Sequence, residues 1–145
     1  MKNKILISLI SLVCSTGFSQ EVVTWNDLAA VKFEKKFFPV YNEFFLYPHF
    51  SSSVKAIRGK KITITGYFLD IDPEDKIFFL SKRPMSSCFF CGIGGPESAI
   101  ELHFPSKPPF KMDDVITVTG ILELNSEDVD HLNYILNECE SKLAK

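Results

Sequence analysis

The chain is 145 residues long, and 46% of its residues are hydrophobic. This length suits a single domain that buries about two-thirds of its unfolded surface, so the fold does not need cross-links for stability. The formal charge is −2 at pH 7. A chain without a basic excess is not expected to bind nucleic acid.

Residues 1–19 have the pattern of a secretory signal peptide. Two lysines precede an apolar run over residues 5–13, and small residues precede a cleavage site before Gln20. The apolar run has about nine residues, whereas a membrane-spanning helix needs about 20. Loss of the two lysines leaves 14 basic and 18 acidic residues, a formal charge of −4. We predict a periplasmic or secreted protein, residues 20–145, with no membrane insertion after cleavage.

Residues 20–59 have no dominant hydrophobic period, and we expect a lid of short helical and irregular elements. Thr24–Asp27 has the spacing of a capping box that begins a short turn. Pro39 and Pro48 prevent a long helix. Three serines at 51–53 can cap a second turn. The lid is assigned to the same domain as the rest of the chain.

From residue 60 onward the hydrophobic period changes to two, which indicates β-strands. The expected strands cover residues 60–69, 77–80, 98–104, 115–124 and 132–139. An acidic turn over residues 70–75 joins the first two strands. The last strand is the least secure, because its apolar residues also fit helical spacing. Closure of a barrel favours a strand there.

Ile62–Gly66 has a counterpart in Ile116–Gly120, 54 positions later, and both copies place a glycine in mid-strand. A mid-strand glycine weakens a strand unless it serves a bulge or a sharp bend, and small closed barrels need such bends. Five short strands with two glycine bends predict a mainly β fold, a five-stranded OB-like barrel over residues 60–141.

The loop between the second and third expected strands contains Cys88-Phe89-Phe90-Cys91-Gly92. The C-x-x-C-G spacing is typical of a metal knuckle, in which a turn brings two thiolates to one ion and the glycine takes positive φ. Thiolates favour zinc, copper(I) or iron. Two sulfurs supply only half of a tetrahedral site, so the remaining ligands must come from elsewhere in the chain or from a second copy.

Cys139 is the best third ligand on chemical grounds, and His103 is a further candidate. His49, His131 and Glu97 stay open as alternatives. Glu97 and His103 cannot share one ion unless the strand breaks, because six residues of strand separate them by roughly 20 Å. The predicted metal ligands are Cys88, Cys91, Cys139 and His103.

The cysteine pair also allows two other interpretations. Outside the cytoplasm, Cys88 and Cys91 can form a disulfide that stiffens a loop. A thiol-redox protein is a weaker alternative, because its C-x-x-C begins a helix, whereas a Gly-Gly-Pro run leads here into a strand. Haem attachment is excluded, because Gly92 stands where histidine is needed.

Nucleophilic chemistry at Cys91 would need a nearby histidine and an orienting acid. Strand alternation places Glu101 beside His103, but it puts neither near the cysteines. We therefore predict no catalytic residues and a non-enzymatic protein.

Several segments together resemble a family of small exported bacterial proteins of unknown function. They are Trp25-x-x-Leu28, Tyr47-Pro48-x-Phe50, Gly59-Lys60-x-Ile62-x-Ile64-x-Gly66-Tyr67 and Cys88-x-x-Cys91-Gly92-x-x-Gly95-Pro96-Glu97. The resemblance spans nearly all of the mature chain. Some wider relatives have C-x-H in place of C-x-x-C and lie in metal-uptake or export-linked gene settings, which implies metal handling. This chain lacks that histidine, so only Cys88 carries over.

The leading prediction is an exported, soluble protein that binds zinc or copper and acts in periplasmic metal handling. The alternative is an interaction module for a protein partner in the cell envelope, with a Cys88–Cys91 disulfide in its binding loop.

Overall fold

The structure is a computed structural model that describes residues 20–72 and 77–145. The predicted signal peptide and part of the predicted acidic turn lie outside the described residues. The helices are α1 (Trp25–Leu28) and α2 (Ser52–Ala56). The strands are β1 (Glu21–Val22), β2 (Val31–Phe38), β3 (Glu43–Phe50), β4 (Lys61–Asp72), β5 (Ile77–Ser81), β6 (Ala99–Leu102), β7 (Val115–Leu124) and β8 (Tyr134–Leu143). Three 3-10 turns are η1 (Met85–Ser87), η2 (Phe89–Cys91) and η3 (Pro96–Ser98).

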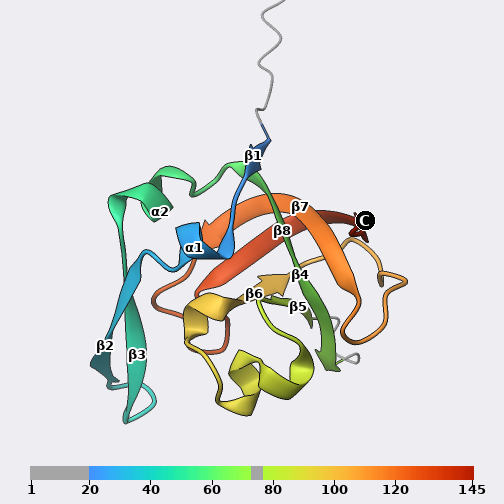
Figure 1. Cartoon of the computed structure of the whole chain (residues 1–145). Coiled ribbons are helices and arrows are strands. Elements are labelled where there is room, and N and C mark those ends of the chain that lie inside the picture. Colours follow the sequence, from blue (N-terminus) through green and yellow to red (C-terminus); the bar gives the residue numbers. More distant parts are fainter. Residues whose placement is uncertain (1–19, 73–76) are drawn as a thin grey trace, which may run out of the picture.

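Five strands close into a barrel in the order β4-β5-β6-β8-β7, and pairing of β7 with β4 completes the ring (Figure 1). Strands β6 and β8 run parallel, whereas the other neighbours in the ring run antiparallel. This is the strand order of an OB barrel. The predicted mainly β fold with a five-stranded OB-like barrel is confirmed.

The barrel is filled by side chains that alternate inward along its strands. The largest of them are Ile62, Ile64, Phe68, Phe78, Leu80, Ile100, Leu102, Ile116, Leu122 and Tyr134, and all are buried. Leu28 of α1 and Val54 of α2 close one end of this core. The Tyr134 hydroxyl donates a 2.6 Å hydrogen bond to the Leu28 carbonyl, which ties α1 to the barrel.

The predicted fifth strand is confirmed by β8, and a bulge explains its helix-like spacing. Thr119 pairs with Glu140, whereas Ile121 pairs with Asn137, so β8 contains one residue more than β7 between these pairs. The extra residue is accommodated where Glu138 takes φ 54°. A bulge breaks the period of two, so Cys139 returns to the core three residues after Leu136.

The lid differs from the prediction in one respect. Its two short helices begin at the expected caps, a Thr24–Asp27 capping box and the Ser51 hydroxyl. Between them, however, β2 and β3, of eight residues each, form a hairpin that extends from the side of the barrel (Figure 1). The barrel covers neither face of most of this hairpin, so its sequence does not alternate between apolar and polar residues.

The two mid-strand glycines serve close approach. Gly120 lies at the register shift of β7, as the bulge prediction requires, and an added Cβ would lie 2.8 Å from the Asn137 carbonyl oxygen. Gly66 lies in a regular part of the β4–β7 ladder. An added Cβ there would lie 2.7 Å from the Ser81 carbonyl oxygen and 2.9 Å from Cζ2 of Trp25. Gly66 thus allows the Trp25 indole to pack directly on the barrel wall.

We expect Gly66→Ala to lower the free energy of unfolding by about 1–3 kcal/mol, because backbone and ring must both shift to admit the methyl group. Urea denaturation followed by circular dichroism measures this change. Thr65→Ala is the matched control in the same strand, since Thr65 is exposed and should cost much less. Equal losses in the two variants would contradict the close-approach explanation.

Candidate functional site

The loop after β5 presents Cys88 and Cys91 at either end of the η2 turn. The Cys91 amide donates to the Cys88 carbonyl, and the Ile93 amide donates to the same oxygen. Gly92 takes φ 77°, as the knuckle spacing predicts. The Phe90 ring lies 4.8 Å from the Phe79 ring of β5, so an aromatic contact holds the turn against the barrel.

A third sulfur joins the two cysteines. Cys88 Sγ lies 4.0 Å from Cys91 Sγ and 3.8 Å from Sδ of Met85. The loop is fixed at Met85, whose amide donates a 2.7 Å hydrogen bond to Asp113 Oδ1. Metal–sulfur bonds of about 2.3 Å at tetrahedral or trigonal angles put sulfur atoms about 3.8–4.0 Å apart. The two distances from Cys88 Sγ match this spacing, and the three sulfurs are here called the sulfur cluster.

Sequence reasoning missed Met85 because it considered only thiolate, imidazole and carboxylate ligands. The available signal was the spacing Met85-x-x-Cys88-x-x-Cys91, which places three sulfurs at regular intervals of three residues. Residues three apart lie above one another in a 3-10 turn, so the two consecutive turns η1 and η2 bring these three side chains close together.

The cysteines of the described chain are free thiols, so the alternative Cys88–Cys91 disulfide is not formed in this structure. The Cys91 thiol is exposed and donates a 2.8 Å hydrogen bond to the Met85 carbonyl. Partial loss of hydration, followed by the hydrogen bond and charge interaction with Cys88, raises the pKa of Cys91. A raised pKa is the opposite of what a redox-active thiol needs.

Cys139 occupies a different place from the cysteine pair. Its thiol is buried in the barrel core and donates a 3.1 Å hydrogen bond to the Leu136 carbonyl. Burial raises the pKa of Cys139 to about 12. In this setting Cys139 behaves as a small hydrophobic side chain.

His103, the fourth predicted ligand, lies in another cluster. Among the described residues, one set of three His, Cys, Asp or Glu side chains brings its ligand atoms within 4.8 Å of one another, and it consists of Glu101, His103 and His131. The structure therefore brings Cys88 and Cys91 together, but it does not group them with Cys139 or His103.

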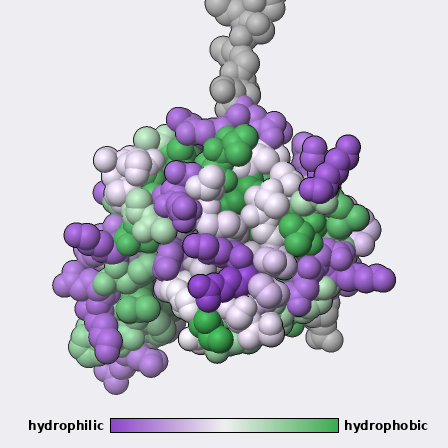
Figure 2. Space-filling model, viewed as in Figure 1, coloured by the Kyte–Doolittle hydropathy of each residue, from purple (hydrophilic) through white to green (hydrophobic). Residues whose placement is uncertain are grey.

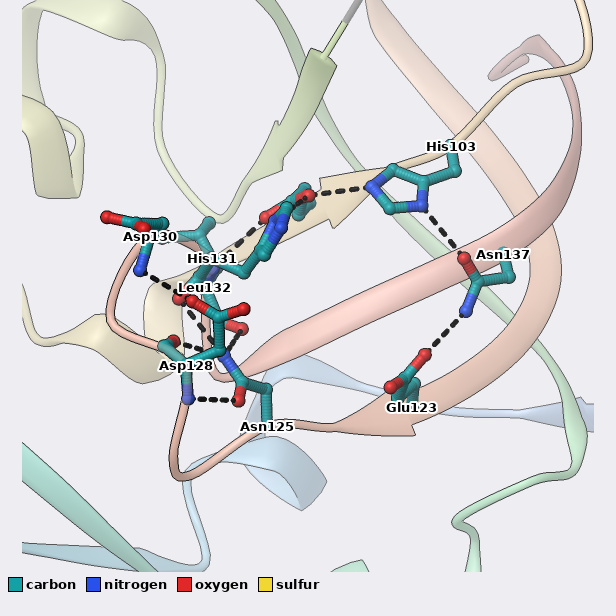
Figure 3. Close-up of polar contacts among 9 residues, drawn as sticks. His103, Glu123, Asn125, Asp128, Asp130, His131, Leu132 and Asn137 are labelled. Atoms are coloured by element: carbon teal, nitrogen blue, oxygen red, sulfur yellow. Dashed lines mark hydrogen bonds and ion pairs between the residues drawn. The ribbon is translucent and has the colours of Figure 1, made fainter.

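The Glu101, His103 and His131 set, here called the Glu-His-His cluster, centres on a buried carboxylate (Figure 3). The Glu101 side chain is only 2% exposed. Its Oε1 lies 2.6 Å from Nε2 of His103 and 2.8 Å from Nδ1 of His131. Its Oε2 accepts the Leu132 amide at 3.1 Å. The hydrogen bond to Glu101 is the main cause that raises the pKa of His131.

Strand alternation predicted Glu101 beside His103, and the structure confirms it. His131 was not predicted there, because it comes from the β7–β8 loop. Asn125 shapes this loop: its Nδ2 donates to the His131 carbonyl, and its Oδ1 accepts the Asp128 amide (Figure 3). Asparagine side chains commonly form such hydrogen bonds to the backbone in turns. The spacing of residues in the sequence does not, however, predict which backbone groups they bond.

A groove of about 410 Å³ lies between the hairpin and the barrel loops, and His131 of the Glu-His-His cluster is part of its lining. Phe38 and Phe45 line it from the hairpin, Phe89 from the cysteine loop, and His131 and Leu132 from the β7–β8 loop. Figure 2 shows the hairpin as mixed surface, in which apolar and hydrophilic side chains lie next to each other.

No protein-family model matches the chain, and no curated protein has a significantly similar sequence. Within residues 20–72 and 77–145, no helix has the length and apolar character needed to cross a membrane. The chemistry of the two clusters is therefore the basis for assigning a function.

We expect Cys91 to react with iodoacetamide more slowly at neutral pH than a free cysteine, because its raised pKa keeps the thiol protonated. The rate should keep rising above about pH 8.5, the ordinary pKa of cysteine. Mass spectrometry of timed samples gives the pH–rate profile for each cysteine. The buried Cys88 and Cys139 are internal controls, which should react only on unfolding. A profile for Cys91 with a midpoint below pH 8.5 would instead favour the thiol-redox alternative.

Proposed function

We propose that this chain is an exported, non-enzymatic metal-binding protein that holds one soft metal ion, copper(I) before zinc, in the sulfur cluster. The observation that carries the proposal is the convergence of Met85, Cys88 and Cys91, with adjacent sulfurs 3.8 and 4.0 Å apart. A thioether is a poor ligand for hard ions, and a mixed thiolate–thioether set selects copper(I).

The surroundings of the sulfur cluster support this role. Cys88 is only 1% exposed, so one sulfur is shielded from solvent. Cys91 is exposed and gives the ion a path of entry. Binding would displace the thiol protons of Cys88 and Cys91, the second of which now donates a hydrogen bond to the Met85 carbonyl, because the thiolate and not the thiol is the metal ligand.

The same arrangement supports a role in metal handling more than a role in catalysis. The sulfur cluster has no histidine or carboxylate grouped with it among the described residues. Such groups would be needed to move protons during a reaction. Shallow placement in a surface loop suits an ion that is taken up and passed on, and this role agrees with the predicted export of the chain.

The test is a Cu(I) titration of the reduced mature protein without oxygen, in competition with a chromogenic Cu(I) chelator. We expect one equivalent to bind, with a sulfur-to-copper charge-transfer band in the ultraviolet. Less than about a tenth of an equivalent would overturn the proposal, because a site with structural affinity fills completely. A parallel Zn²⁺ titration ranks the two metals, and stronger retention of zinc would overturn the preference for copper.

Met85→Leu separates a three-sulfur site from a two-cysteine site. We expect this variant to bind Cu(I) at least about tenfold more weakly. Loss of a residue that only orients a metal ligand already lowers metal affinity about tenfold, and Met85 would be a ligand itself. Met112→Leu is the matched control, since Met112 is exposed outside the cluster and should leave binding unchanged. Cys139→Ala tests the ligand set predicted from sequence. If Cys139→Ala lost the metal and Met85→Leu kept it, the assignment of Met85 would be wrong.

A further inference from the structure

The tautomer of His103 is fixed by its neighbours. Asn137 Nδ2 donates to Glu123 Oε2 at 2.9 Å, so the amide of Asn137 turns its Oδ1 toward the histidine. That oxygen lies 2.8 Å from Nδ1 of His103, and an oxygen without a hydrogen can only accept. Nδ1 of His103 therefore carries a proton, and in the neutral imidazole Nε2 presents a lone pair.

That lone pair faces the buried carboxylate. Nε2 of His103 lies 2.6 Å from Glu101 Oε1, and His131 Nδ1 lies 2.8 Å from the same oxygen. Two acceptors at this distance need a positive species between them, either a proton or a metal ion. The chain Glu123–Asn137–His103 is the arrangement that orients a metal-binding histidine, in which the far ring nitrogen donates to a fixed acceptor.

The cluster can admit an ion with little movement. Zinc bonds of about 2.0–2.2 Å to nitrogen and oxygen put neighbouring ligand atoms about 3.3–3.5 Å apart. The present contacts of 2.6 and 2.8 Å would open by less than about 1 Å. Both imidazoles have room to turn, since the side chains of His103 and His131 are 40% and 38% exposed. Glu101 stays fixed by the Leu132 amide.

The β7–β8 loop adds rigidity and charge. Asn125 holds its carbonyls and amides, and Asp128 Oδ1 accepts the Asp130 amide, so His131 is presented by an ordered turn (Figure 3). Asp128 and Asp130 are both exposed next to this histidine. Their carboxylates give the approach to the cluster a negative potential, which attracts cations.

We propose that Glu101, His103 and His131 form a second metal site, distinct from the sulfur cluster, for a borderline divalent cation such as Zn²⁺. Two imidazoles and one carboxylate are a common zinc ligand set, with the fourth position left to water. This set contains no sulfur, so it selects against copper(I), and the protein would hold two ions of different chemistry.

The first experiment uses the reduced, unaltered mature chain with ¹⁵N-labelled imidazoles and adds Zn²⁺. We expect long-range ¹H–¹⁵N spectra to show coordination shifts at Nε2 of His103 and at Nδ1 of His131. His49 is the internal control, because it also pairs with a glutamate, Glu34, at 3.0 Å but lies on the hairpin. Absence of shifts at His103 and His131 in excess Zn²⁺, or equal shifts at His49, would overturn the proposal.

The second experiment separates this site from the sulfur cluster. In a Cys88→Ser/Cys91→Ser background, Co²⁺ should bind with visible ligand-field bands but without a thiolate-to-cobalt charge-transfer band. Glu101→Gln and His131→Asn should weaken Co²⁺ binding at least tenfold, and Asn137→Ala by about 10–100-fold. His49→Gln should leave it unchanged. Circular dichroism checks that each variant is folded. If a variant unfolds, the ¹H–¹⁵N spectra of the unaltered chain with Zn²⁺ decide the question.

The two proposals can fail separately. Loss of Cu(I) binding in Met85→Leu with Co²⁺ binding intact supports two independent sites. If the cysteine variant binds no Co²⁺, or binds it equally well with His131→Asn, the Glu-His-His cluster is only an ion-paired anchor for the loop. That result would leave the Cu(I) titration unaffected.

Discussion

Pairing of β4 with β7 is the constraint on which the rest of the molecule depends. The ladder from Lys61–Ile121 to Tyr67–Val115 turns a sheet into a closed ring and leaves no free edge among the five barrel strands. Gly66 and Gly120 belong to this ladder and make room for the Trp25 indole and for the Asn137 backbone. Closure also fixes β6 between β5 and β8.

The position of β6 explains how the residues of the two clusters are brought to their places. The cysteine loop leads from β5 into β6, and Glu101 lies on β6 itself. The β7–β8 loop returns to the same region because β8 must pair with β6. Side chains distant in sequence, such as Glu101 and His131, therefore meet through topology. The barrel provides a rigid frame, and the loops supply sulfur ligands in one place and nitrogen and oxygen ligands in another.

The sequence was most informative where one physical rule dominated. Alternation with one buried face revealed the barrel strands, and two mid-strand glycines indicated closure. It was least informative where several weak effects combined. The β2–β3 hairpin has no buried face that would impose a hydrophobic period. Its turn begins at Pro39 and ends at Asn42, which takes φ 52°.

The candidate sites follow the same division. Cys88 and Cys91 were recognisable because a short turn joins them. Met85 required the succession of two 3-10 turns, and His131 required the folded β7–β8 loop, which local spacing does not encode. Cys139 was chosen by chemistry alone, and the bulge at Glu138 directs its thiol into the core.

The hairpin has a mechanical consequence. Its strands pair only with each other, and at its base the Ser51 amide donates to the Ala30 carbonyl. Farther out, Lys36 reaches Glu127 of the β7–β8 loop at 3.2 Å, an exposed contact of the kind that contributes less than about 1 kcal/mol. The hairpin is thus joined to the rest of the chain at its base, and farther out an exposed ion pair adds only a weak contact. Because its hydrogen bonds are independent of the barrel ladder, its amides should exchange with solvent well before those of the barrel.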